Sequence, residues 1–99
     1  MAIKIERSSG NVFRDLGFSR EEAENLRLRS ELMIQLSRMI KARKLTQARA
    51  AKLFGVSQPR VSDLVRGKIG RFSVDTLIAM LGHAGVRVSL TVRRRRQVA

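Results

Sequence analysis

The chain has 99 residues and no cysteine, which predicts one small domain without disulfide bonds or cysteine-based zinc sites. Its hydrophobic fraction of 43% is too high for a disordered tail protein. No apolar run approaches the length of a membrane span, and the N-terminus lacks the apolar segment of a signal peptide. We therefore expect a cytoplasmic protein with no membrane partner.

Positive charge is concentrated in one part of the chain. The formal net charge is +13. Residues 1–37 hold six basic and six acidic side chains, residues 38–71 hold ten and one, and residues 72–99 hold five and one. This distribution predicts a phosphate-binding face built by residues 38–71. All four aromatic residues are Phe, so Tyr or Trp stacking platforms are lacking, which favours duplex DNA over single-stranded RNA.

The N-terminal residues predict a short arm followed by a long helix. Residues 2–6 alternate between apolar and polar side chains, as a short strand does. A small apolar cluster around Gly17 predicts one helical turn; its members are Val12, Phe13, Leu16 and Phe18. Ser19 and Glu22 form a capping box, and a helical pattern continues to about Lys44. The alternative is two helices, broken near Leu28.

Residues 46–67 predict two short helices joined by a tight turn. Thr46 caps the first helix, and Gly55 ends it where the chain requires a positive φ. Ser57 caps the second helix, and Pro59 lies in its first turn. The apolar spacing of that second helix predicts one buried side, formed by Val61, Leu64 and Val65.

The C-terminal third predicts one more helix, a strand and a basic tail. Ser73 caps the helix, and Gly85 ends it. Residues 86–92 alternate with period two, so they form a strand that needs a partner. That partner is the N-terminal strand around Ile3, the same strand of a second copy, or the sheet of another protein. The four arginines of residues 93–96 are either a solvated tail or a further phosphate anchor.

The segment from 46 to 67 resembles the helix-turn-helix of the Cro/repressor (XRE-like) family of DNA-binding proteins. Six positions agree with that motif together: Gln47, Ala51, Gly55, Val56, Val61 and Leu64. The resemblance implies a mainly α fold, a lambda-repressor-like domain of four to five helices with a short N-terminal and a C-terminal β-strand. Its parts are an arm (1–18), the helix-turn-helix domain (19–85), the strand (86–92) and the tail (93–99).

The same resemblance assigns roles to individual side chains. The second helix of the motif lies in the major groove, and its candidates for base contacts are Gln58, Arg60 and Ser62. The candidates for phosphate contacts are Gln47, Ser57, Arg66, Lys68 and Arg71. Asp63 departs from this chemistry because it repels phosphate. We expect it to pair with Arg60 or Arg66, or to lie away from the DNA.

Repressors of this kind bind DNA as two-fold dimers, so the resemblance also implies a homodimer. The chain offers two surfaces for it, the helix that follows Ser73 and the C-terminal strand, and the residues expected at the interface are Val86, Val88, Leu90 and Val92. The run from Val56 to Leu64, and the later helix followed by a β-strand, resemble HigA-type antitoxins, whose partners are RelE-like ribonuclease toxins. The expected function is a sequence-specific repressor that binds double-stranded DNA and serves as the antitoxin and autorepressor of a RelE-like toxin pair. It is expected to be bacterial, nucleoid-associated when bound, and to need no cofactor or metal. The alternatives are a stand-alone phage-type repressor and a non-specific nucleoid-type protein. The sequence contains no pattern that predicts an enzyme.

Overall fold

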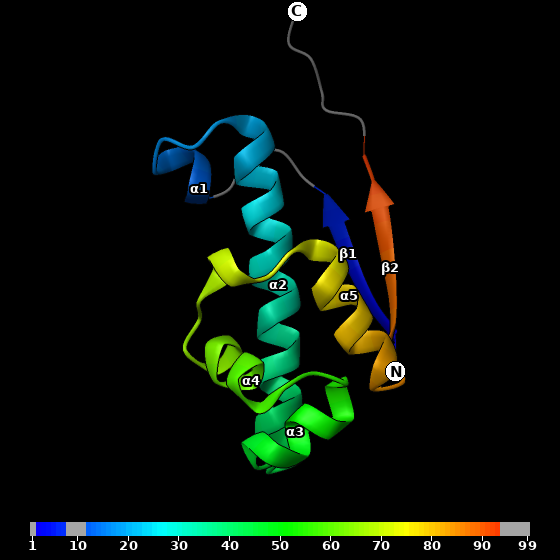
Figure 1. Ribbon diagram of the computed structural model, residues 1–99. Coiled ribbons are helices and arrows are strands. Elements are labelled where there is room, and N and C mark those ends of the chain that lie inside the picture. The colour runs from blue at the N-terminus through cyan, green and yellow to red at the C-terminus, as the bar shows by residue number, and fades with distance from the viewer. Residues whose placement is uncertain (1, 8–11, 94–99) are drawn as a thin grey trace, which may run out of the picture.

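A computed structural model describes residues 2–7 and 12–93 of the chain, and its ribbon is shown in Figure 1. In chain order the elements are β1 (Ala2–Arg7), α1 (Val12–Asp15), α2 (Arg20–Ala42), α3 (Gln47–Phe54), α4 (Gln58–Val65), the 3₁₀ turn η1 (Ile69–Arg71), α5 (Val74–His83) and β2 (Arg87–Val92). The predicted mainly helical fold with two short strands is confirmed. Helix α2 runs along the molecule, with α3 and α4 at one end and the strands beside α5 (Figure 1).

Helix α2 is continuous. The hydroxyl of Ser19 accepts a hydrogen bond from the backbone N–H of Glu22 at 3.2 Å, so the predicted cap is confirmed. The alternative break near Leu28 is wrong, because the helix passes through this residue and buries its side chain. The helix ends at Ala42, and Lys44 then turns the chain with a φ of 51°.

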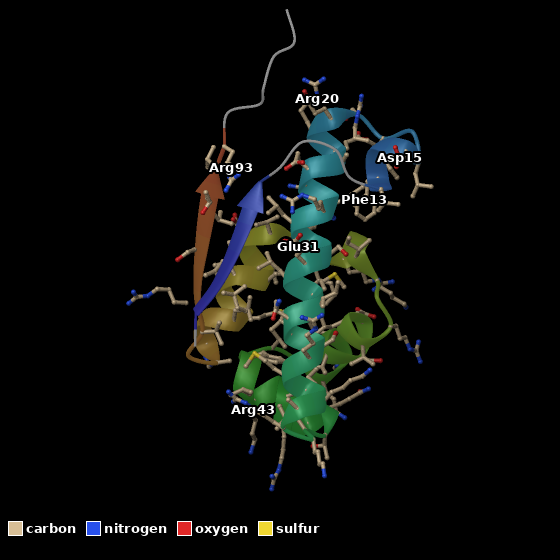
Figure 2. The ribbon with its side chains drawn as sticks, turned by 180° about the vertical axis from the view of Figure 1, so that it is seen from behind. Phe13, Asp15, Arg20, Glu31, Arg43 and Arg93 are labelled. Carbon is tan, nitrogen blue, oxygen red and sulfur yellow. The ribbon has the colours of Figure 1, made fainter. Side chains whose placement is uncertain are left out.

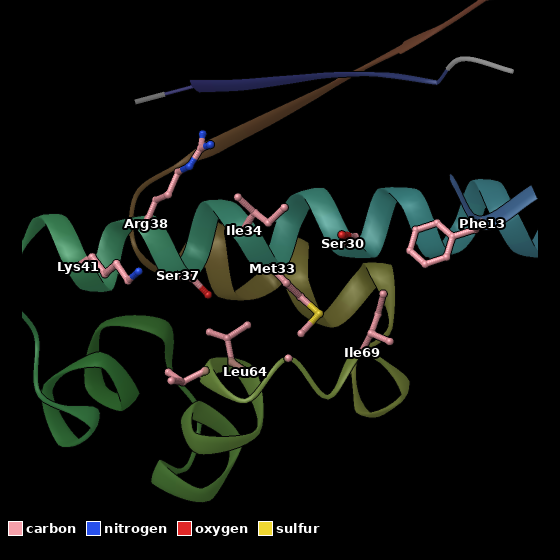
Figure 3. A pocket seen from close by; sticks show the side chains of 11 residues that line it. Phe13, Ser30, Met33, Ile34, Ser37, Arg38, Lys41, Leu64 and Ile69 are labelled. Atoms are coloured by element: carbon pink, nitrogen blue, oxygen red, sulfur yellow. The ribbon is translucent and has the colours of Figure 1, made fainter. Parts of the chain in front are cut away.

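The core lies where α2, α3, α4 and α5 meet, and its side chains come from all four helices. The largest fully buried ones are Phe54, Phe72, Leu32, Leu36, Leu64, Leu77, Met80, Leu81 and Val61. Val65 does not join them: 53% of its surface is exposed, so its predicted burial is wrong. It lies at the C-terminal end of α4 and lines an open cavity of about 550 Å³, together with Met33 and Ile34 of α2 (Figure 3).

The two strands pair with each other, which identifies the partner of the C-terminal strand. β1 and β2 are parallel, with Ile3 opposite Val88. A parallel pair needs a crossover connection, and here the whole helical domain forms it. Ile3 and Val86 are buried in the core, and Val88 packs against it. The two strands therefore pair with each other and pack against the helices.

Candidate nucleic-acid interface

The turn between α3 and α4 sets the position of α4. The hydroxyl of Thr46 caps α3 by accepting from the N–H of Arg49 at 3.1 Å, and that of Ser57 caps α4 by accepting from the N–H of Arg60 at 3.3 Å. Gly55 has a φ of 67°, the left-handed conformation that was predicted. A Cβ at this position would also lie 2.7 Å from Cδ2 of His83. The turn therefore requires glycine for a backbone reason and for a packing reason.

Burial of α4 determines which of its side chains face outward. Val61 and Leu64 are fully buried. Since successive residues of a helix are rotated by about 100°, Ser62 and Asp63 lie on the opposite, outward side, where both are half-buried. By the same rotation Gln58 borders that side, and Arg60 falls on the border next to the core. Gln58 and Arg60 both remain exposed.

Arg60 is folded back onto the segment that follows α4. Its Nη1 donates a hydrogen bond to the backbone carbonyl of Arg71 at 2.7 Å, and its guanidinium carbon lies 5.6 Å from the ring centroid of Phe72. Both contacts follow from its position at the border of the core. A contact between the Arg60 guanidinium and a base therefore competes with its hydrogen bond to the Arg71 carbonyl. Helical spacing gave no signal of this contact, because the two residues are 11 positions apart.

Asp63 forms its ion pairs with the same segment. Its Oδ1 lies 3.7 Å from Nζ of Lys68, and its Oδ2 lies 3.7 Å from Nη1 of Arg71. The predicted pairing with Arg60 or Arg66 is therefore wrong. The structure brings the carboxylate together with two of the cations predicted to bind phosphate.

The end of the molecule that carries α3 and α4 is strongly cationic. Its exposed basic side chains include Arg43, Lys44, Arg49, Lys52 and Arg66, and Figure 2 shows nitrogen-tipped side chains spreading outward at this end, around the labelled Arg43. Asp63 is the one carboxylate between residues 38 and 71. Gln47 and Gln58 are exposed first residues of α3 and α4, where unpaired N–H groups favour anions.

The four strand residues predicted for dimer contact do not share one environment. Val86 is buried in the core of its own chain, and Val88 is half-buried against it. Leu90 and Val92 are exposed, by 46% and 78%. The exposed apolar side chains of this group thus lie at the C-terminal half of β2.

Two absences apply to the part of the chain that the structure describes. Within residues 2–7 and 12–93, no three His, Cys, Asp or Glu side chains are grouped so that they could hold a metal ion. None of the helices in these ranges is apolar over a length sufficient to cross a bilayer.

An outward-facing capped helix, presented by a glycine turn on a cationic surface, defines a helix-turn-helix protein. A family model described as a helix-turn-helix domain matches residues 12–93. A solved structure named as an XRE family transcriptional regulator is 32% identical, with a TM-score of 0.70, and the match covers 79% of this chain and 91% of that one. A search of the curated proteins found no match. The chain belongs to the XRE-like helix-turn-helix family of DNA-binding transcriptional regulators.

Proposed function

We propose that the protein is a sequence-specific repressor that places α4 in the major groove of duplex DNA. The observation that carries this proposal is the orientation of α4: burial of Val61 and Leu64 turns Ser62 outward, with Gln58 at the border of the outward side. The cations around this helix supply the phosphate contacts that hold it in register. The predicted phosphate contacts are Gln47, Ser57, Arg66, Lys68 and Arg71, all of which are exposed.

Among the candidates for base contacts, we give Gln58 and Ser62 the first place. The Gln58 amide can form two hydrogen bonds with adenine, and a serine hydroxyl can donate to or accept from either base of a pair. Arg60 remains a candidate, because a guanidinium can bind guanine through two hydrogen bonds. Its hydrogen bond with the Arg71 carbonyl competes with that contact, which makes its contribution conditional on DNA binding.

The experiment begins with selection of bound duplexes from a random pool, followed by sequencing. Gln58→Ala should weaken binding to the selected duplex by about 1–3 kcal/mol and relax the sequence preference. Asn25→Ala is the matched control, since Asn25 is exposed on α2 and lies outside α3 and α4. Failure of the protein to enrich any sequence would support the non-specific nucleoid-type alternative. Equal losses on selected and random duplexes would show that Gln58 contacts only phosphate.

We also propose a homodimer that uses the exposed part of β2. A two-stranded sheet has unpaired strand edges, and Leu90 and Val92 place apolar surface beside one of them. Two copies would present two α4 helices about one turn of DNA apart. Light scattering during gel filtration should give the dimer mass, and the change of Leu90 and Val92 to Glu should give the monomer mass. A wild-type monomer at micromolar concentration would contradict the dimer.

The antitoxin role is a further proposal, supported by surface that the DNA site does not use. Val12, Leu16 and Phe18 are exposed near α1, and Phe13 lines the apolar cavity beside α2 (Figure 3). Exposed apolar side chains in the same short segment offer a surface for a protein partner. Co-expression with a RelE-like protein encoded by an adjacent gene should yield a complex. Absence of such a neighbour would favour the stand-alone repressor.

A further inference from the structure

Asp63 places a negative charge on the side of α4 that we expect to meet a polyanion. Its carboxylate lies between Nζ of Lys68 and Nη1 of Arg71, at 3.7 Å from each. The three side chains therefore present a net charge of about one instead of two where phosphate contacts are expected. A carboxylate in this position needs an explanation, because it opposes the affinity that the surrounding cations provide.

The segment that carries Lys68 and Arg71 is held in place by hydrogen bonds that do not involve the Asp63 carboxylate; one of them joins the Lys68 N–H to the Asp63 backbone carbonyl at 3.0 Å. Arg29 of α2 donates hydrogen bonds to the carbonyls of Ile69 and Phe72, at 3.2 and 3.4 Å. Arg60 donates to the carbonyl of Arg71 at 2.7 Å. The ion pairs of Asp63 are partly solvated: 42% of the Lys68 side chain and 63% of the Arg71 side chain are exposed, against 21% of the Asp63 side chain. Such pairs contribute little to folding, so the Asp63 carboxylate restrains the two cationic side chains and not the backbone beneath them.

The carboxylate also discriminates among base edges. In the major groove the hydrogen-bond donors are the amino groups of cytosine and adenine, whereas guanine and thymine present acceptors. A carboxylate on the outward side of α4 is repelled by phosphates and by acceptor edges. It finds a hydrogen bond only where an amino group faces it.

We propose that Asp63 is a specificity-determining residue that lowers the affinity for non-cognate DNA. It does so by occupying Lys68 and Arg71 and by repelling phosphate. On the cognate site a base amino group compensates the carboxylate, so affinity there is not reduced in the same proportion. This inference rests on the proposed function, because it assigns a specificity-determining residue to the same DNA-binding site.

The test compares Asp63→Asn with Asp15→Asn, on the duplex selected by the wild type and on a random duplex. Asp15 is exposed on α1, at the end of the molecule away from α3 and α4 (Figures 1 and 2), so its variant has the same net charge. Asp63→Asn should raise the affinity for the random duplex roughly five- to tenfold. It should steepen the dependence of log K on log salt by about one to two, since each phosphate contact adds about 0.9. The ratio of the affinity for the selected duplex to that for the random duplex should stay at its wild-type value in Asp63→Glu and in Asp15→Asn.

Equal gains on both duplexes, an unchanged salt slope, or the same gain in Asp15→Asn would overturn the inference. Selection with Asp63→Asn should also lose a preference for cytosine or adenine at one position, and retention of every preference would count against it. If Asp63→Asn does not fold, a second pair of variants decides. One double variant replaces Lys68 and Arg71 by Gln, and the other replaces Arg49 and Lys52 by Gln. The first should weaken binding to the random duplex less than the second, and an equal loss would overturn the inference. A wild-type protein that enriches no sequence refutes the proposed function itself.

Discussion

Replacement of Gly55 by alanine should destabilise the protein more than the same replacement at Gly67, although both glycines have left-handed backbone angles. The φ values are 67° at Gly55 and 72° at Gly67. The left-handed region costs an L-residue about 1–2 kcal/mol relative to the right-handed one. This backbone cost is common to the two variants, so it cancels when they are compared.

The surroundings of the added methyl group differ between the two positions. At Gly67 a Cβ meets no atom within 4 Å, so we expect the backbone cost alone. At Gly55 it would lie 2.7 Å from Cδ2 of His83, an exposed ring that must move away. The ring then gives up its contact between Nδ1 and the Leu53 carbonyl at 3.3 Å, and a lost hydrogen bond costs about 0.5–1.5 kcal/mol. Gly55→Ala should therefore cost about 1.5–3.5 kcal/mol, against about 1–2 kcal/mol for Gly67→Ala.

Thermal and urea unfolding followed by circular dichroism measures this difference. In a domain of this size an excess of about 1 kcal/mol lowers Tm by roughly 4–8 °C. The His83→Ala background supplies the decisive control, because it removes the ring that the methyl group meets. The excess cost at Gly55 should disappear in that background. Equal losses at the two glycines, or an excess that persists without His83, would refute the packing explanation of the turn.

Four further changes give separate expectations. Gly55→Val should unfold the motif, because a β-branched residue resists positive φ, and retained helicity with full DNA binding would show that the turn tolerates it. Arg29→Ala should lower stability by about 1–3 kcal/mol through loss of its bonds to Ile69 and Phe72, whereas Arg38→Ala on the same helix should not. Arg60→Ala should lower Tm. It should change the sequence that the protein selects less than Gln58→Ala does, and a larger change would show that Arg60 leaves Arg71 to contact bases. Deletion of the four arginines of residues 93–96 should weaken binding to every duplex and flatten the salt dependence. All of them but Arg93 lie outside the described residues. An unchanged salt slope would show that the tail does not contact phosphate.

Local sequence patterns determined the helices and the turn of this protein. Thr46, Ser57 and Ser73 each cap a helix through a hydroxyl that accepts an N–H three residues later. Gly55 adopts the positive φ that its place between two helical patterns required. These features depend on interactions within a few residues, so the sequence alone contains the information.

Only the tertiary structure decided the partners of Arg60, of Asp63 and of the strands. Whether β2 pairs with β1 or with a second copy depends on how the whole helical domain folds between them. Arg60 contacts Arg71 and Phe72, and Asp63 contacts Lys68 and Arg71, because η1 brings residues that follow α4 back against its side. Helical spacing predicts neighbours three and four positions apart on the same helix. It cannot predict where the chain returns after the helix has ended, and at this interface that return determines which cations are available for DNA.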